Sequence, residues 1–238
     1  MSTNKEKLLS AEDLNNALKR LDLQMAKNDF LGAFAPINVV SAGGYLAVTY
    51  FENRQATGDI DYIIDPQFRK DDDIKTPLKE AIRSVAKKEK FDAEWMNNEM
   101  EIWATHEACV KIFDQAYKQN IVLFDEKSLK VWAAPFEWAL ERKIKRIANS
   151  GRGAEMKVDM NDALVLFKHF RDANNGPLDM EHYRNLNTNG FDIMPEVGQM
   201  EKIAANYQDL YKQDLFHPPA AADATSSYAA TSAASANT

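Results

Sequence analysis

Two different periods of hydrophobic residues run through the first part of the chain. Residues 11–25 place an apolar side chain at every third or fourth position, which is typical of a helix with one buried face. Ser10, with Asp13 three residues later, has the form of a capping box at the start of that helix. Residues 37–41 and 60–64 are instead short runs rich in β-branched residues, which predict buried strands.

Helical periods dominate further along the chain. Thr76 followed by Pro77 has the form of an N-cap with proline in the first turn, so a helix is expected to begin there. Apolar runs at 121–124 and 129–132 predict two strands joined by a turn. From Pro135 onward the pattern is helical. The helices expected in this second half span residues 135–148, 158–170, 179–187 and 195–212, with a loop at 150–153.

This order of elements predicts an α+β fold, in which a mixed sheet flanked by helices is followed by a helical C-terminal half. We expect residues 1–134 to form the sheet-containing domain and residues 135–216 to form a helical region that packs on it. Residues 217–238 are rich in Ala, Ser and Thr and have no periodicity, which predicts a disordered tail.

Composition narrows the class of protein. The formal net charge of −7 argues against a protein that coats nucleic acid through a general basic field. Cys109 is the only cysteine, so no intrachain disulfide can form and a reducing compartment is the simplest environment. The chain starts without the apolar run of a secretory signal, and no stretch approaches the roughly 20 apolar residues of a membrane span. We therefore expect a cytoplasmic protein without a membrane partner.

The strongest chemical signal is a pair of acidic residues at the second predicted strand. Asp59 and Asp61 are two positions apart, so both side chains project from one face of the strand. Two carboxylates about 4 Å apart repel each other by roughly 4 kcal/mol at an effective dielectric near 20. A divalent cation removes this repulsion, and Mg²⁺ prefers carboxylate oxygens together with substrate phosphates. The pair predicts a site for Mg²⁺, with Mn²⁺ as an alternative.

A glycine pair precedes these acids. Gly43-Gly44 follows the first predicted strand and opens a short helical segment, so that backbone N–H groups can approach a phosphate. Arg54 and Thr57 lie just upstream of the acids, where they could contact phosphate or hold the loop. Alone, a Gly-Gly pair is most often a tight turn, and an Asp-x-Asp is most often a solvated strand end. Their order along the chain instead favours a site that binds a metal ion and a nucleotide.

In this order the residues resemble the nucleotidyltransferase superfamily, which includes DNA polymerase beta, poly(A) polymerases and aminoglycoside nucleotidyltransferases. The similarity is greatest to its AbiEii-type toxins and covers roughly residues 37–170. The residues that carry it are Gly43-Gly44, the string Arg54-Gln-Ala-Thr57-Gly-Asp59-Ile-Asp61, and, on later helices, Lys143 and Asp162. The resemblance implies a fold of the polymerase-beta type and a nucleoside triphosphate as substrate.

The resemblance also implies a third carboxylate on a later strand, which would activate an acceptor hydroxyl. The two candidates are Asp125, at the end of strand 121–124, and Glu101. Lys143 would contact the triphosphate or the leaving pyrophosphate, and Asp162 would orient Lys143 across two helices. A solvated helix lysine is an alternative for Lys143, because other basic residues crowd the same helix.

The expected function is therefore the Mg²⁺-dependent transfer of a nucleoside monophosphate from a nucleoside triphosphate to an acceptor hydroxyl. The sequence leaves open whether the acceptor is RNA, protein or a small molecule, and whether the chain has a protein partner or forms a homo-oligomer. Two other functions are considered. One is a non-catalytic nucleotide-binding protein on the same fold, and the other is a protein–protein interaction module in which the Asp-x-Asp is structural.

Overall fold

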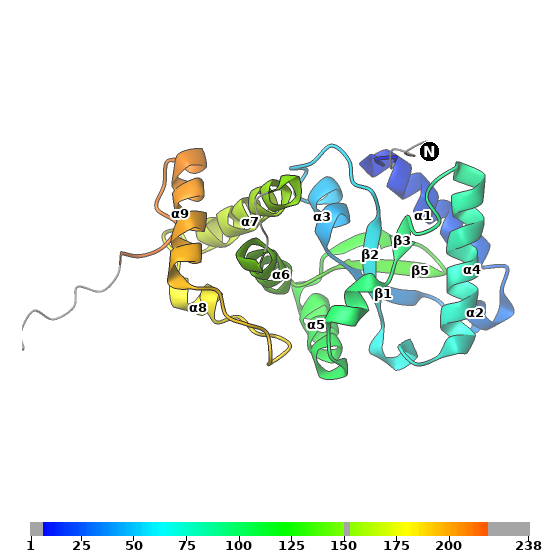
Figure 1. Ribbon diagram of the computed structural model, residues 1–238. Helices are drawn as coiled ribbons and strands as arrows, with labels where there is room; N and C mark the ends of the chain where they lie inside the picture. Colours follow the sequence, from blue (N-terminus) through cyan, green and yellow to red (C-terminus); the bar gives the residue numbers. More distant parts are fainter. Residues whose placement is uncertain (1–6, 150–152, 219–238) are drawn as a thin grey trace, which may run out of the picture.

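Five short strands form one mixed sheet in the first half of the chain (Figure 1). The computed structural model describes residues 7–149 and 153–218. Along the sheet the strands follow the order β3-β2-β1-β5-β4. Helices flank this sheet, and the elements that follow it within the described residues are helices, so the predicted α+β fold is confirmed. The strands are β1 (Ile37–Ser41), β2 (Ile60–Ile64), β3 (Met96–Asn97), β4 (Val122–Asp125) and β5 (Leu129–Ala133).

The pairing of the central strands decides which loops meet. Strand β1 is antiparallel to β2 and parallel to β5, while β3 is parallel to β2 and β4 is antiparallel to β5. Ser41, at the end of β1, lies opposite Tyr62, near the start of β2. The segment that follows β1 and the segment that precedes β2 therefore meet at the same end of the sheet.

Two apolar cores lie on opposite faces of the sheet, because successive side chains of a strand point to opposite faces. On β1, Val39 belongs to the core with α1 (Ala11–Met25), α2 (Asp29–Ala33) and α4 (Asp72–Glu89). Val40 belongs to the other core, with α5 (His106–Gln119). Helix α3 (Gly43–Thr49) contributes Tyr45 to the first core and Leu46 to the second.

The C-terminal helices extend the second core away from the sheet (Figure 1). One apolar cluster runs from Ile63 on β2 through Leu140 and Phe167 to Tyr207. The helical half therefore shares a continuous core with the sheet. Its helices are α6 (Phe136–Asn149), α7 (Ala154–Ala173), α8 (Met180–Arg184) and α9 (Val197–Tyr211), and two short 3-10 helices in the first half are η1 (Pro66–Phe68) and η2 (Glu99–Trp103).

Helix α4 begins one turn earlier than the sequence predicted. Its N-cap is Asp71, whose side chain accepts a hydrogen bond from the backbone N–H of Asp73 at 3.0 Å. Thr76 is therefore not a cap, and Pro77 lies inside the helix. The run of aspartates provides both the capping oxygen and acidic residues in the first turn, where the helix dipole favours negative charge.

The predicted loop and the predicted tail lie partly outside the described residues. Residues 150–152 of the predicted loop lie outside the described residues, and α7 begins at Ala154 with Gly153 as its N-cap. Of the predicted tail, 219–238 lie outside them too, whereas the backbone N–H of His217 donates to the Leu178 carbonyl at 3.0 Å. Within the described ranges, no helix has the length and apolar character needed to cross a bilayer.

Candidate functional site

The glycine pair lets α3 approach the loop before β2 closely. A Cβ atom at Gly44 would lie 1.9 Å from Thr57 Oγ1 and 2.7 Å from Thr57 Cβ, which is closer than atoms can approach. Gly43 has a φ of +65°, and a Cβ there would lie 3.3 Å from Asp61 Oδ2. The two positions therefore need glycine, and Thr57 holds this loop against α3. The first turn of α3 consequently lies beside Asp61.

Asp59 and Asp61 lie at the start of β2, at the end of the sheet where α3 begins. Asn97 on β3 is in register with Asp61, and its side-chain amide donates to Asp59 Oδ2 at 3.1 Å. Burial raises the pKa of Asp61 above its ordinary value, and the neighbouring charge of Glu99 adds to this, although Arg146, Asn97 and Lys143 act in the opposite direction. No described Lys or Arg forms an ion pair with Asp61.

Across from the sheet, helices α6 and α7 carry a buried network of charges. Lys143 Nζ lies 2.8 Å from Asp159 Oδ1 and 2.6 Å from Asp162 Oδ2. Arg146 reaches Asp159 with Nε at 2.9 Å from Oδ2 and Nη2 at 2.5 Å from Oδ1. Lys143 is only 5% exposed, so its interpretation as a solvated lysine is wrong. The structure joins Lys143 to Asp162, as the sequence suggested.

Arg54 ties the loop before β2 to the same network. Its Nε donates to Asp162 Oδ1 at 2.9 Å, and its Nη2 forms an ion pair with Asp162 Oδ2. The Asn53 amide also donates to Asp162 Oδ1, at 3.1 Å. Of the two roles considered for Arg54, the loop-holding one therefore matches its contacts. The three cations Arg54, Lys143 and Arg146 exceed the two paired carboxylates by one positive charge.

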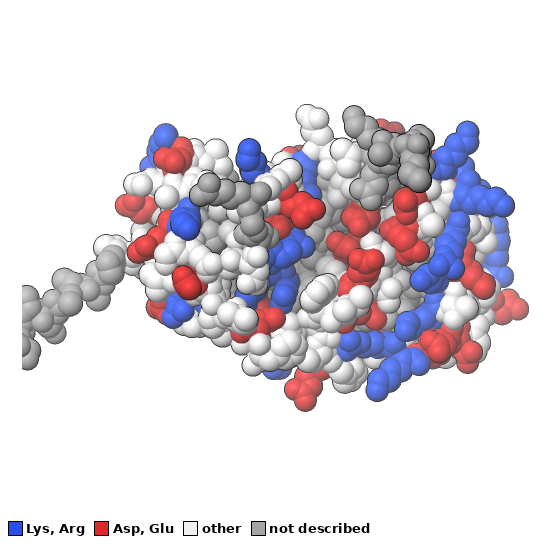
Figure 2. Space-filling view, in the orientation of Figure 1, with Lys and Arg blue, Asp and Glu red and all other residues white. Residues whose placement is uncertain are grey.

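A cavity of about 400 Å³ separates the acidic wall from the basic wall. Figure 2 shows Asp and Glu side chains over β2 and β3, which face Lys and Arg side chains over α6 across a hollow. Most of the residues that the sequence singled out line this cavity. They are Gly43, Gly44, Arg54, Thr57, Asp59, Asp61 and Lys143, joined by Arg146, Glu155 and Asp159. Asp162 lies behind Lys143 and lines a smaller recess next to Gly43.

A second cavity of about 400 Å³ adjoins the first on the other side of Asp61. The two share Gly43, Asp61, Lys143 and Arg146. The second one is more apolar, and its walls include Met100, Trp103, Trp138, Arg142 and Lys145. The Asp61 carboxylate thus lies where a charged compartment meets one with aromatic walls.

Asp125, one candidate for the third carboxylate, lies at the opposite end of the sheet. It is exposed on the edge strand β4 and forms an ion pair with Lys130 at 2.7 Å. Lys130 pairs with Asn38 near the start of β1, whereas Asp61 lies beyond the end of that strand. The expectation that Asp125 joins Asp59 and Asp61 is wrong, because β4 runs antiparallel to β5 and ends near the wrong end of β1.

Glu101, the other candidate, also lies apart from the acids. Its buried carboxylate accepts a hydrogen bond from the backbone N–H of Ile64 at 3.2 Å, at the far end of β2. The strand beside β2 presents Asn97 opposite Asp61, so an amide rather than a carboxylate lies next to Asp61 in the sheet. In the part of the chain that the structure describes, no three His, Cys, Asp or Glu side chains are grouped to hold a metal ion.

Two acids can nevertheless accept a divalent cation here. Asp59 and Asp61 leave one strand face, line the same cavity and lie beside a desolvated environment that disfavours the ionised form of Asp61. A bound cation would offset that cost, and Mg²⁺ needs only one or two carboxylates when substrate phosphates complete its coordination. The donor set therefore fits Mg²⁺ bound together with a phosphate ligand better than Mg²⁺ bound alone.

The predicted site residues did not include three residues that the structure places in this site. Arg146 lies three positions after Lys143, and Asp159 lies three positions before Asp162, so each pair shares a helix face. That spacing is a signal that could have found them. Asn97 has no comparable signal, because β3 is two residues long.

Comparisons with known proteins add no name to this site. No family model matches the chain, and neither a curated protein nor a solved structure does. The function proposed below therefore rests on the geometry of the site.

Proposed function

We propose that the protein binds a nucleoside triphosphate with Mg²⁺ and transfers the nucleoside monophosphate to an acceptor hydroxyl. The observation that carries this proposal is the cavity whose one wall is Asp59 and Asp61 and whose other wall is Lys143 and Arg146. A metal–polyphosphate complex has positive and negative parts that match these two walls.

Each wall would contribute a different part of the binding. Asp59 and Asp61 would hold Mg²⁺, which when bound supplies positive charge at the phosphate oxygens. The first turn of α3, with Gly43 and Gly44, lines the same cavity, and its backbone N–H groups would contact the phosphates. On the opposite wall, 54% of the Arg146 side chain is exposed, so it can turn toward a phosphate. Lys143 is only 6% exposed in its side chain and is held by two aspartates, so it presents a fixed charge.

In the transfer, the acceptor oxygen would bond to the α-phosphorus as the bond to the bridging oxygen of pyrophosphate breaks, and the acceptor proton must move to a base. Asn97, opposite Asp61, cannot accept that proton. The carboxylates that line this cavity, among them Asp59, Asp61 and Glu155, are the groups that could accept it. The adjoining compartment, walled by Trp103 and Trp138, is where an acceptor could reach Asp61 from the side away from the triphosphate.

The presence of Asn97 favours a second candidate, a non-catalytic nucleotide-binding protein on the same site. An amide beside Asp59 and Asp61 lowers the negative charge of the site and removes one possible base. Such a protein would bind the Mg²⁺ nucleotide and release no pyrophosphate. The Asn97→Asp variant separates the two candidates, because a third carboxylate should raise transfer only where transfer is limited by its absence.

The first experiment is calorimetric titration of the full chain with ATP, CTP, GTP and UTP, with Mg²⁺ and with EDTA. We expect binding of at least one nucleotide that depends on Mg²⁺ and is lost in Asp59→Asn/Asp61→Asn. The matched control is Asp125→Asn/Glu126→Gln, which removes the same charge at the other end of the sheet and should bind as the wild type does. Failure of every nucleotide to bind would refute both candidates and leave the interaction module.

The second experiment measures pyrophosphate release with fractions of a cell extract as the acceptor source. Release by the wild type that disappears in Asp59→Asn/Asp61→Asn supports the transferase. Nucleotide binding without release in any fraction, by either the wild type or Asn97→Asp, supports the non-catalytic protein instead.

A further inference from the structure

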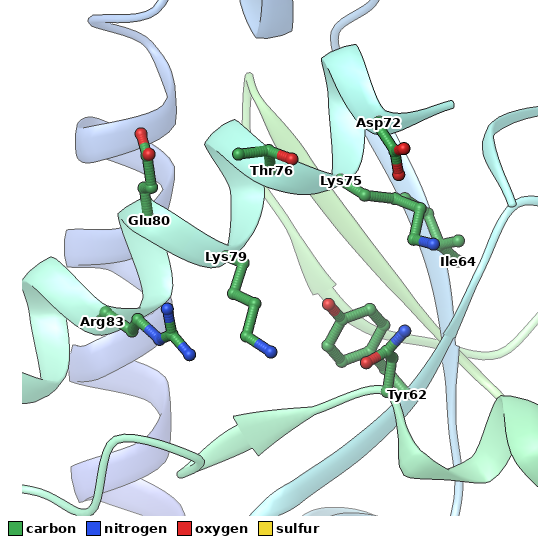
Figure 3. Close-up of a pocket in the computed structure, with 9 residues that line it drawn as sticks. Tyr62, Ile64, Asp72, Lys75, Thr76, Lys79, Glu80 and Arg83 are labelled. Carbon is green, nitrogen blue, oxygen red and sulfur yellow. The ribbon is translucent and has the colours of Figure 1, made fainter. Parts of the chain in front are cut away.

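A separate cavity of about 330 Å³ lies on the opposite face of β2, between the sheet edge and α4 (Figure 3). Its sheet side is formed by Tyr62, Ile64 and Asn98. Tyr62 belongs to the core beneath α1 and α4, whereas its neighbour Asp61 lines the first cavity. The residues of α4 that line it are Asp72, Lys75, Thr76, Lys79, Glu80 and Arg83. Strand β2 therefore separates two cavities with different lining residues.

The α4 side of this cavity is a row of cations. Lys75, Lys79 and Arg83 are spaced four residues apart, so they lie along one face of the helix, where like charges repel. Among the described residues, Lys75 and Lys79 form no ion pair, and Arg83 has only a long contact of 3.8 Å with Glu94. That contact is exposed and contributes little to stability. The row therefore retains positive charge that an anion would offset.

The sheet side offers the hydroxyl of a largely buried tyrosine, which lines the cavity without a hydrogen-bond partner among the described residues. Tyr62 is 6% exposed, and its hydroxyl forms no hydrogen bond within the described part of the chain. Figure 3 shows that this hydroxyl points into the space beneath α4 into which Lys79 and Arg83 extend, while Glu80 points away. Burial raises the pKa of Tyr62, so the hydroxyl stays protonated and can donate. The hydroxyl is therefore available to donate to a ligand that enters the cavity.

We propose that this cavity binds a phosphorylated small molecule of nucleotide size, at a site distinct from the one beside Asp59 and Asp61. Three cations and a neutral donor line the space together with Asp72 and Glu80, which leaves one net positive charge for the anionic oxygens of a ligand. The volume of about 330 Å³ is that of a small-molecule site, which spans about 300–1,000 Å³ in general. The net charge of −7 disfavours indiscriminate binding of polyanions, so a confined ligand fits better than a nucleic-acid strand.

The test uses the full chain in EDTA, which disables the Mg²⁺-dependent site, and titrates inorganic pyrophosphate and AMP by calorimetry. The wild type should bind at least one of them. Lys79→Glu/Arg83→Glu should weaken binding by at least about 100-fold, since each lost charge-assisted contact accounts for about tenfold. Tyr62→Phe keeps the ring and should weaken binding by about tenfold through the loss of one hydrogen bond.

Two controls locate the binding. Lys87→Glu/Lys88→Glu changes charge equally on the same helix but outside the cavity, and Asp59→Asn/Asp61→Asn alters the first site; both should bind as the wild type does. Thermal melts verify that each variant is folded. If Lys79→Glu/Arg83→Glu is unfolded, the loss of binding expected in Tyr62→Phe decides the test.

Four results would overturn the proposal. The first is that the wild type binds neither pyrophosphate nor AMP, and the second is that Lys79→Glu/Arg83→Glu or Tyr62→Phe binds as tightly as the wild type. The third is that Asp59→Asn/Asp61→Asn loses binding. The fourth is that the protein binds a single-stranded oligonucleotide but neither of the two probes. The last would make α4 a nucleic-acid surface rather than a small-molecule site.

Discussion

The two walls of the central cavity shift the pKa values of their aspartates in opposite directions. On the sheet wall, desolvation dominates at Asp61 and raises its pKa. On the helical wall, burial also raises the pKa of Asp159, but Lys143 and Arg146 outweigh it and hold the pKa below its ordinary value. The two aspartates of the helical wall thus have cationic partners within the protein, whereas Asp61 on the sheet wall forms no ion pair with a described Lys or Arg. The ion pairs between α6 and α7 are therefore expected to contribute to stability at neutral pH, whereas ionisation of Asp61 is not.

The largest expected effect comes from removing ion pairs of the helical wall. Asp162→Ala would leave Lys143 with one acidic partner and Arg54 without its ion pair, so we expect a loss of about 3 kcal/mol in the free energy of unfolding. Urea unfolding followed by circular dichroism measures it. Asp172→Ala on the same helix is the control, because its pair with Lys168 is exposed and should contribute less than about 1 kcal/mol. Equal losses would show that the buried network is not what stabilises this wall.

A smaller loss should follow from adding one methyl group at the boundary between the walls. Gly44→Ala places a Cβ 1.9 Å from Thr57 Oγ1, so α3 or the loop must move, at a cost of about 2 kcal/mol. Nucleotide titration should show weakened binding as well. Gly32→Ala, which meets no atom within 4 Å, is the matched control and should leave both quantities nearly unchanged. A fully stable Gly44→Ala variant would mean that the close approach to Thr57 is not required.

The smallest effect is expected on the sheet wall, where the prediction concerns Asp61. Because the folded pKa of Asp61 is raised, its protonation stabilises the protein below the unfolded pKa, and this contribution is lost as pH rises through the folded pKa. In EDTA at neutral pH, Asp61→Asn should therefore stabilise the fold, by about 1 kcal/mol. Thermal melts across the acidic and neutral range measure this.

The opposite sign is expected at Asp159. Its folded pKa is lowered, so it contributes stability above the unfolded pKa that is lost as pH falls through the folded pKa. Asp159→Asn should destabilise the protein at neutral pH and lessen its sensitivity to acid. A destabilising Asp61→Asn, or a stabilising Asp159→Asn, would contradict the distinction between the two walls.

Local pattern was sufficient to predict much of this molecule. The α+β order, four of the five strands and the placement of Gly43-Gly44 ahead of Asp59 and Asp61 follow from short-range periodicity, because strand alternation and glycine's freedom act within a few residues. The link between Lys143 and Asp162 was expected from the resemblance, and the structure brings the two side chains together. The start of α4 was missed because two adjacent segments both offer a capping side chain, and local pattern does not choose between them.

What the sequence determined by itself is which residues share a strand face or a helix turn. Only the tertiary structure decided which strands are neighbours: it placed Asp125 at the far end of the sheet, bound Glu101 to the end of β2, and set Asn97 beside Asp61. It also decided that Tyr62 faces a row of cations on α4. The physical reason is that strand order and register are fixed by packing between residues distant in the chain, and a two-residue strand such as β3 has no periodicity of its own.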